Sequence, residues 1–387
     1  MVFTFRDDGP STFSRQTLLE KRTKVMSKVE TIELRPGYNI SRVIRGGWQL
    51  SGGHGSVDKK AAISDMKTFL DSGITTIDCA DIYTGVEEII GSFIENLRNE
   101  CGHSIANSVK VHTKLVPDLA RLPDIKPTEV ENIVDRSLMR LKVQQLDLVQ
   151  FFWWDMSIGK ATEMLGILKE CQSKGKIANL GVTNWDSEQI SLFLESGFDL
   201  ISSQVQFSIL DRRPLNGLTD WSCAKSMNLL CYGTLAGGFL EEKWLGKSDP
   251  GYSFSNRSLI KYRLIIDEFG SWELFQELLS VLKRIGDIHR VSLSSVAIRW
   301  VLEQPRVAAA IVGARYACHL SKTLEVFKFK LTSKDKAAVA MLLDKASGPL
   351  GPVYGLESDR SSRHGRIMKY NLNNSPEEEI PESSSSE

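Results

Sequence analysis

An aspartate, a tyrosine and a lysine stand out in this sequence because their chemistries are complementary. Asp78 and Tyr83 are five positions apart in TTIDCADIYTGVEE (75–88), and Lys114 lies in VHTKL (111–115). A phenol titrates near pH ~10, and a nearby ammonium lowers that pKa. A carboxylate would hold the ammonium in place. We therefore predict a proton donor, a lysine that tunes it and an aspartate that anchors the lysine.

Each of these residues follows or ends a segment with the pattern of a strand. The β-branched residues of 75–77 predict a strand that runs through Thr84-Gly85 into a helix with an acidic first turn. Residues 109–116 predict the next strand. Polar groups at the carboxyl ends of neighbouring strands would meet at one rim. The spacing alone is a weak signal, so an Asx turn at Asp78 and a packing role for Tyr83 are the alternatives.

Segments with strand and helix patterns alternate along most of the chain. The expected strands lie at 40–52, 75–81, 109–116, 146–154, 177–184, 200–208, 229–238 and 307–314. Eight such units at short spacing predict a (β/α)8 TIM barrel. An open doubly wound sheet is the competing layout, but it would need G-x-G-x-x-G after the first strand, and GGWQLSGG does not fit.

Local signals also predict where helices begin and end. Gly73 is expected to end the first helix. Capping boxes are expected at Thr128 with Glu131 and at Asp186 with Gln189.

Composition divides the chain into four parts. Residues 1–30 are an N-terminal extension of unknown role, and 31–347 form the predicted barrel. Residues 348–371 are expected to be an ordered tail folding over the barrel, and 372–387 a disordered acidic and serine-rich tail. A long insert at 239–270 follows the seventh strand; such segments in compact domains are usually functional.

Charge and hydropathy exclude several classes of protein. The 387 residues carry a net charge of zero, without a basic stripe, so no nucleic-acid partner is expected. No run of ~18 apolar residues is present, so we expect no membrane partner. The six cysteines have no metal-ligand spacing, which predicts no metal site and a reduced, cytoplasmic protein. Organelle targeting by residues 1–30 stays open, as does the oligomeric state.

The Asp-x-Ala-x-x-Tyr pattern at 78–83 and the Thr-Lys pair at 113–114 resemble the aldo-keto reductase family, and the resemblance extends over roughly 40–371. It implies NADPH-dependent reduction of an aldehyde or ketone, a small-molecule carbonyl substrate, with Tyr83 as proton donor and Lys114 and Asp78 as its partners. NADP(H) is the expected cofactor, and NAD(H) is less favoured.

The resemblance also assigns residues to the cofactor. Thr183, Asn184 and Gln204 would bind the nicotinamide carboxamide, since polar side chains supply both donors and acceptors. Tyr232 would stack under the nicotinamide ring. The remaining positions are Gly233 and Leu235 after the seventh strand and Gly313, Arg315, His319 and Thr323 after the eighth. Arg315 or His319 could pair with a 2′-phosphate, which favours NADP(H). An ordinary cap at Asn184 and an ordinary surface role for Arg315 are the alternatives.

One position departs from the family. Phe152 stands where the family has a histidine that binds the substrate carbonyl. Loss of one positioned donor costs about 3–4 kcal/mol of transition-state stabilisation. Two functions therefore stay open: a carbonyl reductase weakened at this step, or a catalytically weak NADP(H)-binding sensor or regulatory protein. His112 is expected to be structural and to face the barrel interior. The aromatic residues expected at the substrate pocket are Trp48, Trp153, Trp244 and Tyr262.

Overall fold

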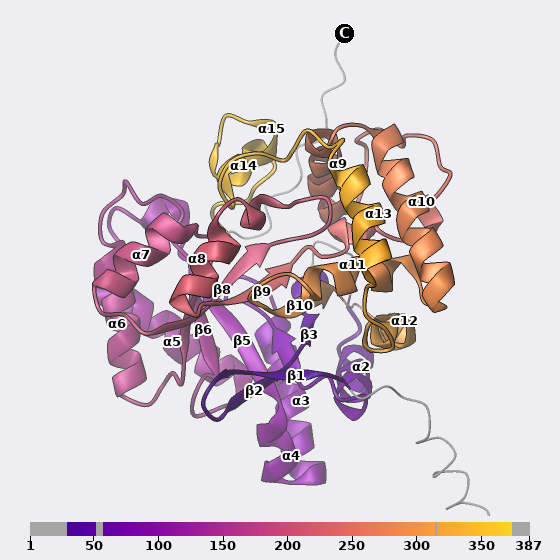
Figure 1. Cartoon of the computed structure of the whole chain (residues 1–387). Coiled ribbons are helices and arrows are strands. Elements are labelled where there is room, and N and C mark those ends of the chain that lie inside the picture. The colour runs from indigo at the N-terminus through magenta and orange to yellow at the C-terminus, as the bar shows by residue number, and fades with distance from the viewer. Residues whose placement is uncertain (1–28, 52–56, 314–315, 374–387) are drawn as a thin grey trace, which may run out of the picture.

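The computed structural model describes residues 29–51, 57–313 and 316–373. Eight parallel strands close into a barrel in the order β10-β3-β4-β5-β6-β7-β8-β9, and helices surround it (Figure 1). This confirms the predicted (β/α)8 architecture. The strands are β3 (Val43–Gly46), β4 (Thr76–Asp78), β5 (Lys110–Leu115), β6 (Leu148–Phe151), β7 (Leu180–Thr183), β8 (Leu200–Gln206), β9 (Asn228–Tyr232) and β10 (Val307–Gly313).

The barrel strands are shorter than the segments expected from the sequence. β4, for example, ends at Asp78, whereas the strand pattern continued to residue 81. Parallel pairing aligns Asp78 with His112 and Lys114 with Gln150. Thr183 of β7 is aligned with Gln204 of β8. The ladder therefore brings polar side chains from five neighbouring strands to the carboxyl rim of the barrel.

Helices cover the outside of the barrel and its rims. They are α2 (Lys59–Asp71), α3 (Val86–Cys101), α4 (His103–Ser108), α5 (Pro127–Leu141), α6 (Ala161–Ser173), α7 (Ser187–Glu195), α8 (Leu218–Lys225), α9 (Arg257–Phe269), α10 (Trp272–His289), α11 (Leu293–Leu302), α12 (Leu320–Leu324), α13 (Ser333–Leu343), α14 (Gly355–Ser358) and α15 (Arg363–Arg366). No helix in the described ranges is long and apolar enough to cross a membrane.

The capping predictions have mixed outcomes. The box of Asp186 with Gln189 is confirmed at the start of α7. The box predicted at residues 128 and 131 is wrong, because α5 begins earlier, at Pro127, whose fixed φ suits the first helical position. The Glu129 carboxylate instead accepts a hydrogen bond from the Lys126 backbone N–H at 3.1 Å. Gly73 follows the C-cap Ser72 of α2 in a left-handed conformation (φ +97°).

A hairpin that the sequence analysis missed precedes the barrel. β1 (Thr31–Arg35) and β2 (Tyr38–Ser41) pair antiparallel around Pro36-Gly37. Leu34, Tyr38 and Ile40 pack on barrel-interior residues such as Ile44 and Leu148. The hairpin therefore closes the end of the barrel away from α14 and α15 (Figure 1). The expectation that strand one starts at residue 40 is wrong, because 40–41 belong to this hairpin.

Two chain segments cover the opposite, carboxyl end. The insert after β9 is not structureless, since it contains the 3-10 helix η6 (Glu242–Trp244) and α9. The C-terminal tail runs over the barrel mouth as α14 and α15 (Figure 1). Its residues contact several rim loops: the Val353 N–H donates to Asp186 at 3.1 Å, and the Leu372 N–H donates to Asp118 at 2.8 Å. The predicted tail over the barrel is confirmed.

Candidate active site

A buried ion pair lies at the carboxyl rim where β4 and β5 end. The Lys114 Nζ donates to both Asp78 carboxylate oxygens, at 2.8 and 2.9 Å, and to the Cys79 carbonyl at 2.8 Å. Both side chains are about 6% exposed. Burial lowers the pKa of Lys114, but the nearby negative charge of Asp78 outweighs it and raises the pKa above its ordinary value. Lys114 is therefore a fixed positive charge at this rim.

Two glutamines complete the polar cluster around Asp78. The Gln204 Nε2 donates to Asp78 Oδ1 at 2.6 Å and to Gln150 Oε1 at 3.1 Å. The Gln150 Nε2 lies 3.4 Å from the same Asp78 oxygen. Gln150 was not among the predicted site residues, although its place in LVQF marks it as a polar residue within a buried strand. Here the Gln204 amide nitrogen is directed at Asp78.

Tyr83 lies in the loop between β4 and α3, beside Lys114. The Lys114 Nζ is 5.1 Å from the centroid of the Tyr83 ring, and the Trp48 ring centroid is 5.0 Å away on a tilted plane. Burial raises the pKa of the Tyr83 phenol, and the charge of Lys114 offsets only part of this rise. The expectation that the ammonium lowers this pKa below its ordinary value is therefore wrong, because desolvation outweighs it.

Phe152 directly follows β6 and is buried in an aromatic group. Its ring packs edge-on against Trp154 at 4.7 Å and against Tyr354 of the tail at 5.7 Å. Phe152, Trp153 and Asn184 line one side of a cavity of about 350 Å³, and the tail residues 352–355 line another. Trp153 is thus at this cavity, with its indole N–H bonded to the Ile158 carbonyl at 3.0 Å.

At the ends of β7 and β9, three of the residues that were predicted to bind the nicotinamide lie close together. Asn184 is left-handed (φ +61°), and its Oδ1 accepts a hydrogen bond from the Tyr232 hydroxyl at 2.8 Å. The Thr183 hydroxyl donates to the Gln204 carbonyl at 3.1 Å. Within the described ranges the Asn184 Nδ2 makes no hydrogen bond to protein, which leaves an amide donor at the cavity. This arrangement suits a ligand that carries a carboxamide.

The turn after β9 lies under α9. Gly233 has φ +71°, and a Cβ added there would lie 2.1 Å from the Tyr262 hydroxyl, so the close approach requires glycine. Leu235 is half-buried and precedes the 3-10 helix η5 (Ala236–Gly238). Trp244 lies elsewhere: it packs against Phe239 at 4.8 Å, and its indole donates to the Gly238 carbonyl at 2.9 Å. Trp244 does not line the 350 Å³ cavity.

The residues expected at the adenosine end are spread along β10 and the segment that follows. Gly313 ends β10 and lies against the Gln49 side chain. His319 is exposed, and the Thr323 hydroxyl donates to the His319 carbonyl at 3.3 Å. Arg315 lies outside the described residues.

A buried charge network ties the tail to the rim, and the sequence analysis missed it. The Arg213 guanidinium pairs with Asp211 at 2.6 Å and with Glu357 of α14 at 2.9 Å, and all three side chains are at most 1% exposed. The Lys261 Nζ of α9 is 3.4 Å from Glu357 and lies over the rings of Tyr232 and Tyr354. No local pattern signals this contact, since Arg213 and Glu357 are 144 residues apart.

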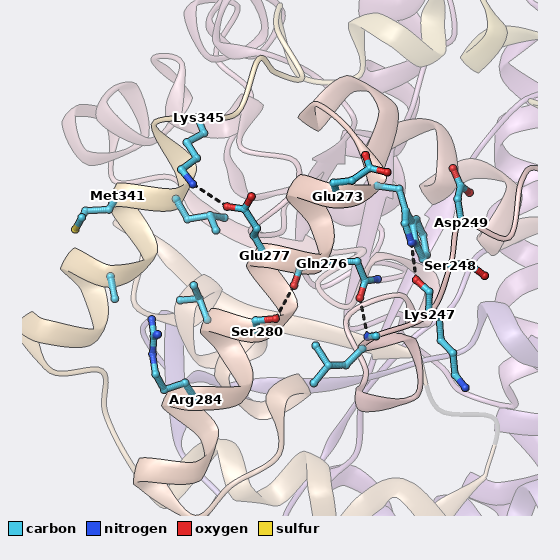
Figure 2. A pocket seen from close by; sticks show the side chains of 16 residues that line it. Lys247, Ser248, Asp249, Glu273, Gln276, Glu277, Ser280, Arg284, Met341 and Lys345 are labelled. Carbon is cyan, nitrogen blue, oxygen red and sulfur yellow. Dashed lines mark hydrogen bonds and ion pairs between the residues drawn. The ribbon is translucent and has the colours of Figure 1, made fainter.

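A larger groove of about 1190 Å³ lies away from this site, between α10, α13 and residues 245–249 (Figure 2). Some of its polar groups pair with one another. Lys345 bonds to Glu277 at 2.7 Å, and the Gln276 carboxamide accepts from the Gly246 N–H at 2.7 Å. None of the described residues that the sequence predicts for the site lines this groove.

Comparison with known proteins decides the family. The model of the aldo/keto reductase family matches residues 42–344. The chain belongs to the aldo/keto reductase family. This reductase is 28% identical over 329 residues to Aldo-keto reductase YhdN of Bacillus subtilis (strain 168), covering 82% of this chain and 95% of that relative. It is 24% identical over 311 residues to the NADH-specific methylglyoxal reductase of Escherichia coli (strain K12), covering 76% of this chain and 92% of the relative.

Solved structures agree with this assignment. The glycerol dehydrogenase AKR11B4 from Gluconobacter oxydans matches the aldo/keto reductase fold of this chain with a TM-score of 0.70 and 26% identity, covering 85% of this chain and 99% of that one. An aldo/keto reductase from Klebsiella pneumoniae in complex with NADP and acetate has a TM-score of 0.62 at 19% identity, covering 85% and 98%. The chain is thus an NAD(P)H-dependent oxidoreductase of this family.

Proposed function

We propose that this reductase uses NADPH to reduce an aldehyde or ketone, with Tyr83 giving the proton to the carbonyl oxygen. The observation that carries the proposal is the buried Asp78–Lys114 pair, at 2.8 Å, whose ammonium lies against the Tyr83 ring. An anchored ammonium stabilises the negative charge that develops on a phenol as its proton leaves. A purely structural ion pair has no need of a phenol beside it.

The raised pKa of Tyr83 determines the direction of proton transfer. Burial keeps the phenol protonated at neutral pH, so Tyr83 is ready to donate rather than to accept. Asp78 holds the Lys114 ammonium in place through two hydrogen bonds. Gln204 and Gln150 in turn hold the Asp78 carboxylate. These four side chains (Asp78, Lys114, Gln204 and Gln150) therefore influence proton transfer to the substrate only through their effect on Tyr83.

The residues at the ends of β7 and β9 fit a nicotinamide cofactor. When bound, the reduced cofactor supplies the hydride that adds to the carbonyl carbon. The Asn184 amide, fixed by Tyr232, would bind the carboxamide, and the Tyr232 ring would support the nicotinamide face. Gly233, which has no room for a side chain, leaves its backbone accessible to the pyrophosphate. Gly313, Arg315, His319 and Thr323 remain our assignment for the adenosine end.

The test is consumption of NADPH by the full chain with a panel of aldehydes and ketones. Tyr83→Phe is expected to lower kcat by about 10²–10⁴-fold, the usual contribution of a general acid, while NADPH binding is retained. Tyr252→Phe is the matched control, because the Tyr252 hydroxyl bonds to Asp267 on α9 and its side chain is half exposed. Equal turnover in the native protein and Tyr83→Phe would contradict the proposal.

The preference for NADPH over NADH has its own test. Arg315→Gln and His319→Gln remove the groups assigned to the 2′-phosphate, so they should raise the KM for NADPH and leave the KM for NADH unchanged. An equal rise in the KM for NADPH and for NADH would show that neither residue binds the 2′-phosphate.

Phe152 supports a second candidate function, that of a catalytically weak NADP(H)-binding sensor. Its ring can neither donate a hydrogen bond nor titrate, and it is only 3% exposed. Tight NADPH binding without turnover, together with turnover in Phe152→His, would favour the sensor. Turnover in the native protein that is lost in Tyr83→Phe favours the reductase.

A further inference from the structure

Phe152 leaves the proposed reaction without the second hydrogen-bond donor beside Tyr83, and the surrounding residues show where a donor could come from. The two tryptophans next to Phe152 are already occupied: the Trp153 indole donates to Ile158 at 3.0 Å and the Trp154 indole donates to Pro117 at 2.7 Å. Strand β6 and its loop therefore supply no free indole N–H to a substrate.

The C-terminal tail places a phenol on the Phe152 ring. Tyr354 packs edge-on against Phe152 at 5.7 Å with an interplanar angle of 80°. Its side chain is 7% exposed, and its hydroxyl makes no hydrogen bond to protein within the described ranges. Tyr354, Phe152 and Asn184 line the same cavity of about 350 Å³. A hydroxyl without a protein partner, on a largely buried residue at a cavity, is suited to a polar group of a ligand.

The tail holds Tyr354 in this place from both sides. On one side, the Val353 N–H donates to Asp186 at 3.1 Å. On the other, Glu357 is buried against Arg213 at 2.9 Å. Between these anchors Tyr354 has a left-handed backbone (φ +63°), which a non-glycine residue keeps only when its surroundings enforce it.

Tyr354 packs on Phe152, the residue at the position where the family has the carbonyl-binding histidine. Burial raises the pKa of Tyr354, and the negative charge of Glu357 raises it further. Tyr83 is not among the residues that line the cavity, whereas Tyr354 and Phe152 both line it. The raised pKa keeps the Tyr354 hydroxyl protonated, so it can act as a hydrogen-bond donor at the cavity.

We propose that Tyr354 donates a hydrogen bond to the substrate carbonyl oxygen, in the place left empty by Phe152. This inference rests on the proposed carbonyl reduction. Tyr354 keeps its proton throughout and lowers the energy of the developing oxyanion, while Tyr83 transfers the proton. The donor therefore comes from the tail rather than from a barrel strand.

The first test is Tyr354→Phe in the full chain with NADPH, which keeps the ring that packs on Phe152. We expect kcat/KM for carbonyl reduction to fall about 10²-fold, as for other oxyanion donors, with unchanged NADPH binding and an unchanged melting temperature. Tyr252→Phe, which removes a hydroxyl bonded to Asp267, should have no effect. A loss of less than about threefold in Tyr354→Phe would overturn the inference, given that one donor is worth ~10²-fold.

A double-mutant cycle adds a second readout. If Tyr354 fills the role of the missing histidine, Phe152→His should restore activity to Tyr354→Phe by a larger factor than it changes the native protein. Equal factors in the two backgrounds would mean that the two positions act independently, and the inference would fail.

Ligand binding keeps the inference testable even if the native protein does not turn over. Benzaldehyde is titrated into the complex with oxidised NADP, where no hydride can pass, and the fluorescence of Trp153 and Trp154 reports binding. Tyr354→Phe is expected to weaken binding about 5- to 10-fold, the value of one hydrogen bond. Equal affinity in the two proteins would refute the role of Tyr354, whereas absent turnover with weakened binding would refute only the proposed reduction.

Discussion

Asp78 accepts hydrogen bonds from Lys114, Gln204 and Gln150, so one carboxylate holds side chains from three other strands. Its negative charge compensates the buried Lys114 ammonium. A buried charge that loses its partner is costly, because the low-dielectric interior cannot solvate it. The same residue therefore contributes to stability and to the state of Tyr83.

Asp78→Asn should show both contributions. Removing the charge leaves Lys114 without its counter-ion, and we expect a loss of about 3–5 kcal/mol in the free energy of unfolding, measured by urea denaturation. Asp71→Asn, in the exposed Lys67–Asp71 pair on α2, is the control and should unfold like the native protein. Equal stability of the two variants would contradict this account of Asp78.

The pKa of Tyr83 makes a second prediction at this scale. Because burial raises this pKa, the phenol should carry its proton across the neutral range. The rate of carbonyl reduction is therefore expected to stay level from about pH 6 to 9 and to fall only above the ordinary tyrosine pKa of about 10. A kcat profile that declines between about pH 7 and 8 would show a lowered pKa instead.

Residue patterns predict part of this chemistry. The strand patterns predicted that Asp78, Tyr83 and Lys114 meet at one rim, since each residue lies at or near the end of such a pattern, although their spacing alone is a weak signal. The direction of the Tyr83 pKa was not predictable, because it depends on how much water the fold excludes. The role of Gln150 was hidden for a similar reason: a polar residue in a strand becomes significant only once its neighbours are known.

At the scale of elements, the tail is fixed by a charge network rather than by apolar packing alone. Burial raises the pKa of Glu357, but Lys261 and Arg213 lower it to about 2, below its ordinary value. A carboxylate with a depressed folded-state pKa contributes stability at pH values above its ordinary pKa. That contribution is lost as the pH falls from about 4.5 toward 2.

Glu357→Gln should therefore loosen the tail. Arg213 would lose one of two carboxylate partners, and we expect faster hydrogen exchange in residues 352–372 together with weaker carbonyl reduction. Glu277→Gln, in the exposed pair with Lys345, should leave both unchanged. If the native protein and Glu357→Gln exchanged alike, the charge network would not be what holds the tail.

Element prediction succeeded where periodicity is local and failed where contacts are distant. The strands and helices of the barrel each carry their own pattern. The β1–β2 hairpin was missed because its strands have only five and four residues, although Pro36-Gly37 marked the turn. The pairing of Arg213 with Glu357 leaves no mark in either local sequence.

At the scale of the whole molecule, the hairpin and the barrel share an interior hydrogen bond. The His112 Nε2 lies 3.1 Å from the Tyr38 hydroxyl, and the imidazole is fully buried. Burial and the charges of Lys114 and Lys110 lower the pKa of His112 to about 3. The unfolded chain therefore binds a proton that the folded protein does not between pH 6.5 and about 3.

Stability should accordingly rise with pH across that window and level off above it. His112→Gln, which keeps a polar side chain but does not titrate, is expected to flatten the slope of unfolding free energy against pH by about one proton. His103→Gln, on the exposed surface of α4, should preserve the native slope. Identical slopes in the native protein and His112→Gln would show that this imidazole is not protonated on unfolding.

The order of the segments along the chain has a consequence for biosynthesis. All eight barrel strands are translated before residues 348–373, which roof the mouth. Domains form as their residues emerge, so a nascent chain can close its strands into a cylinder while Arg213 still lacks Glu357 and Phe152 still lacks Tyr354. Catalytic activity should therefore appear only after residues 348–373 have emerged, later than the protease resistance of the barrel.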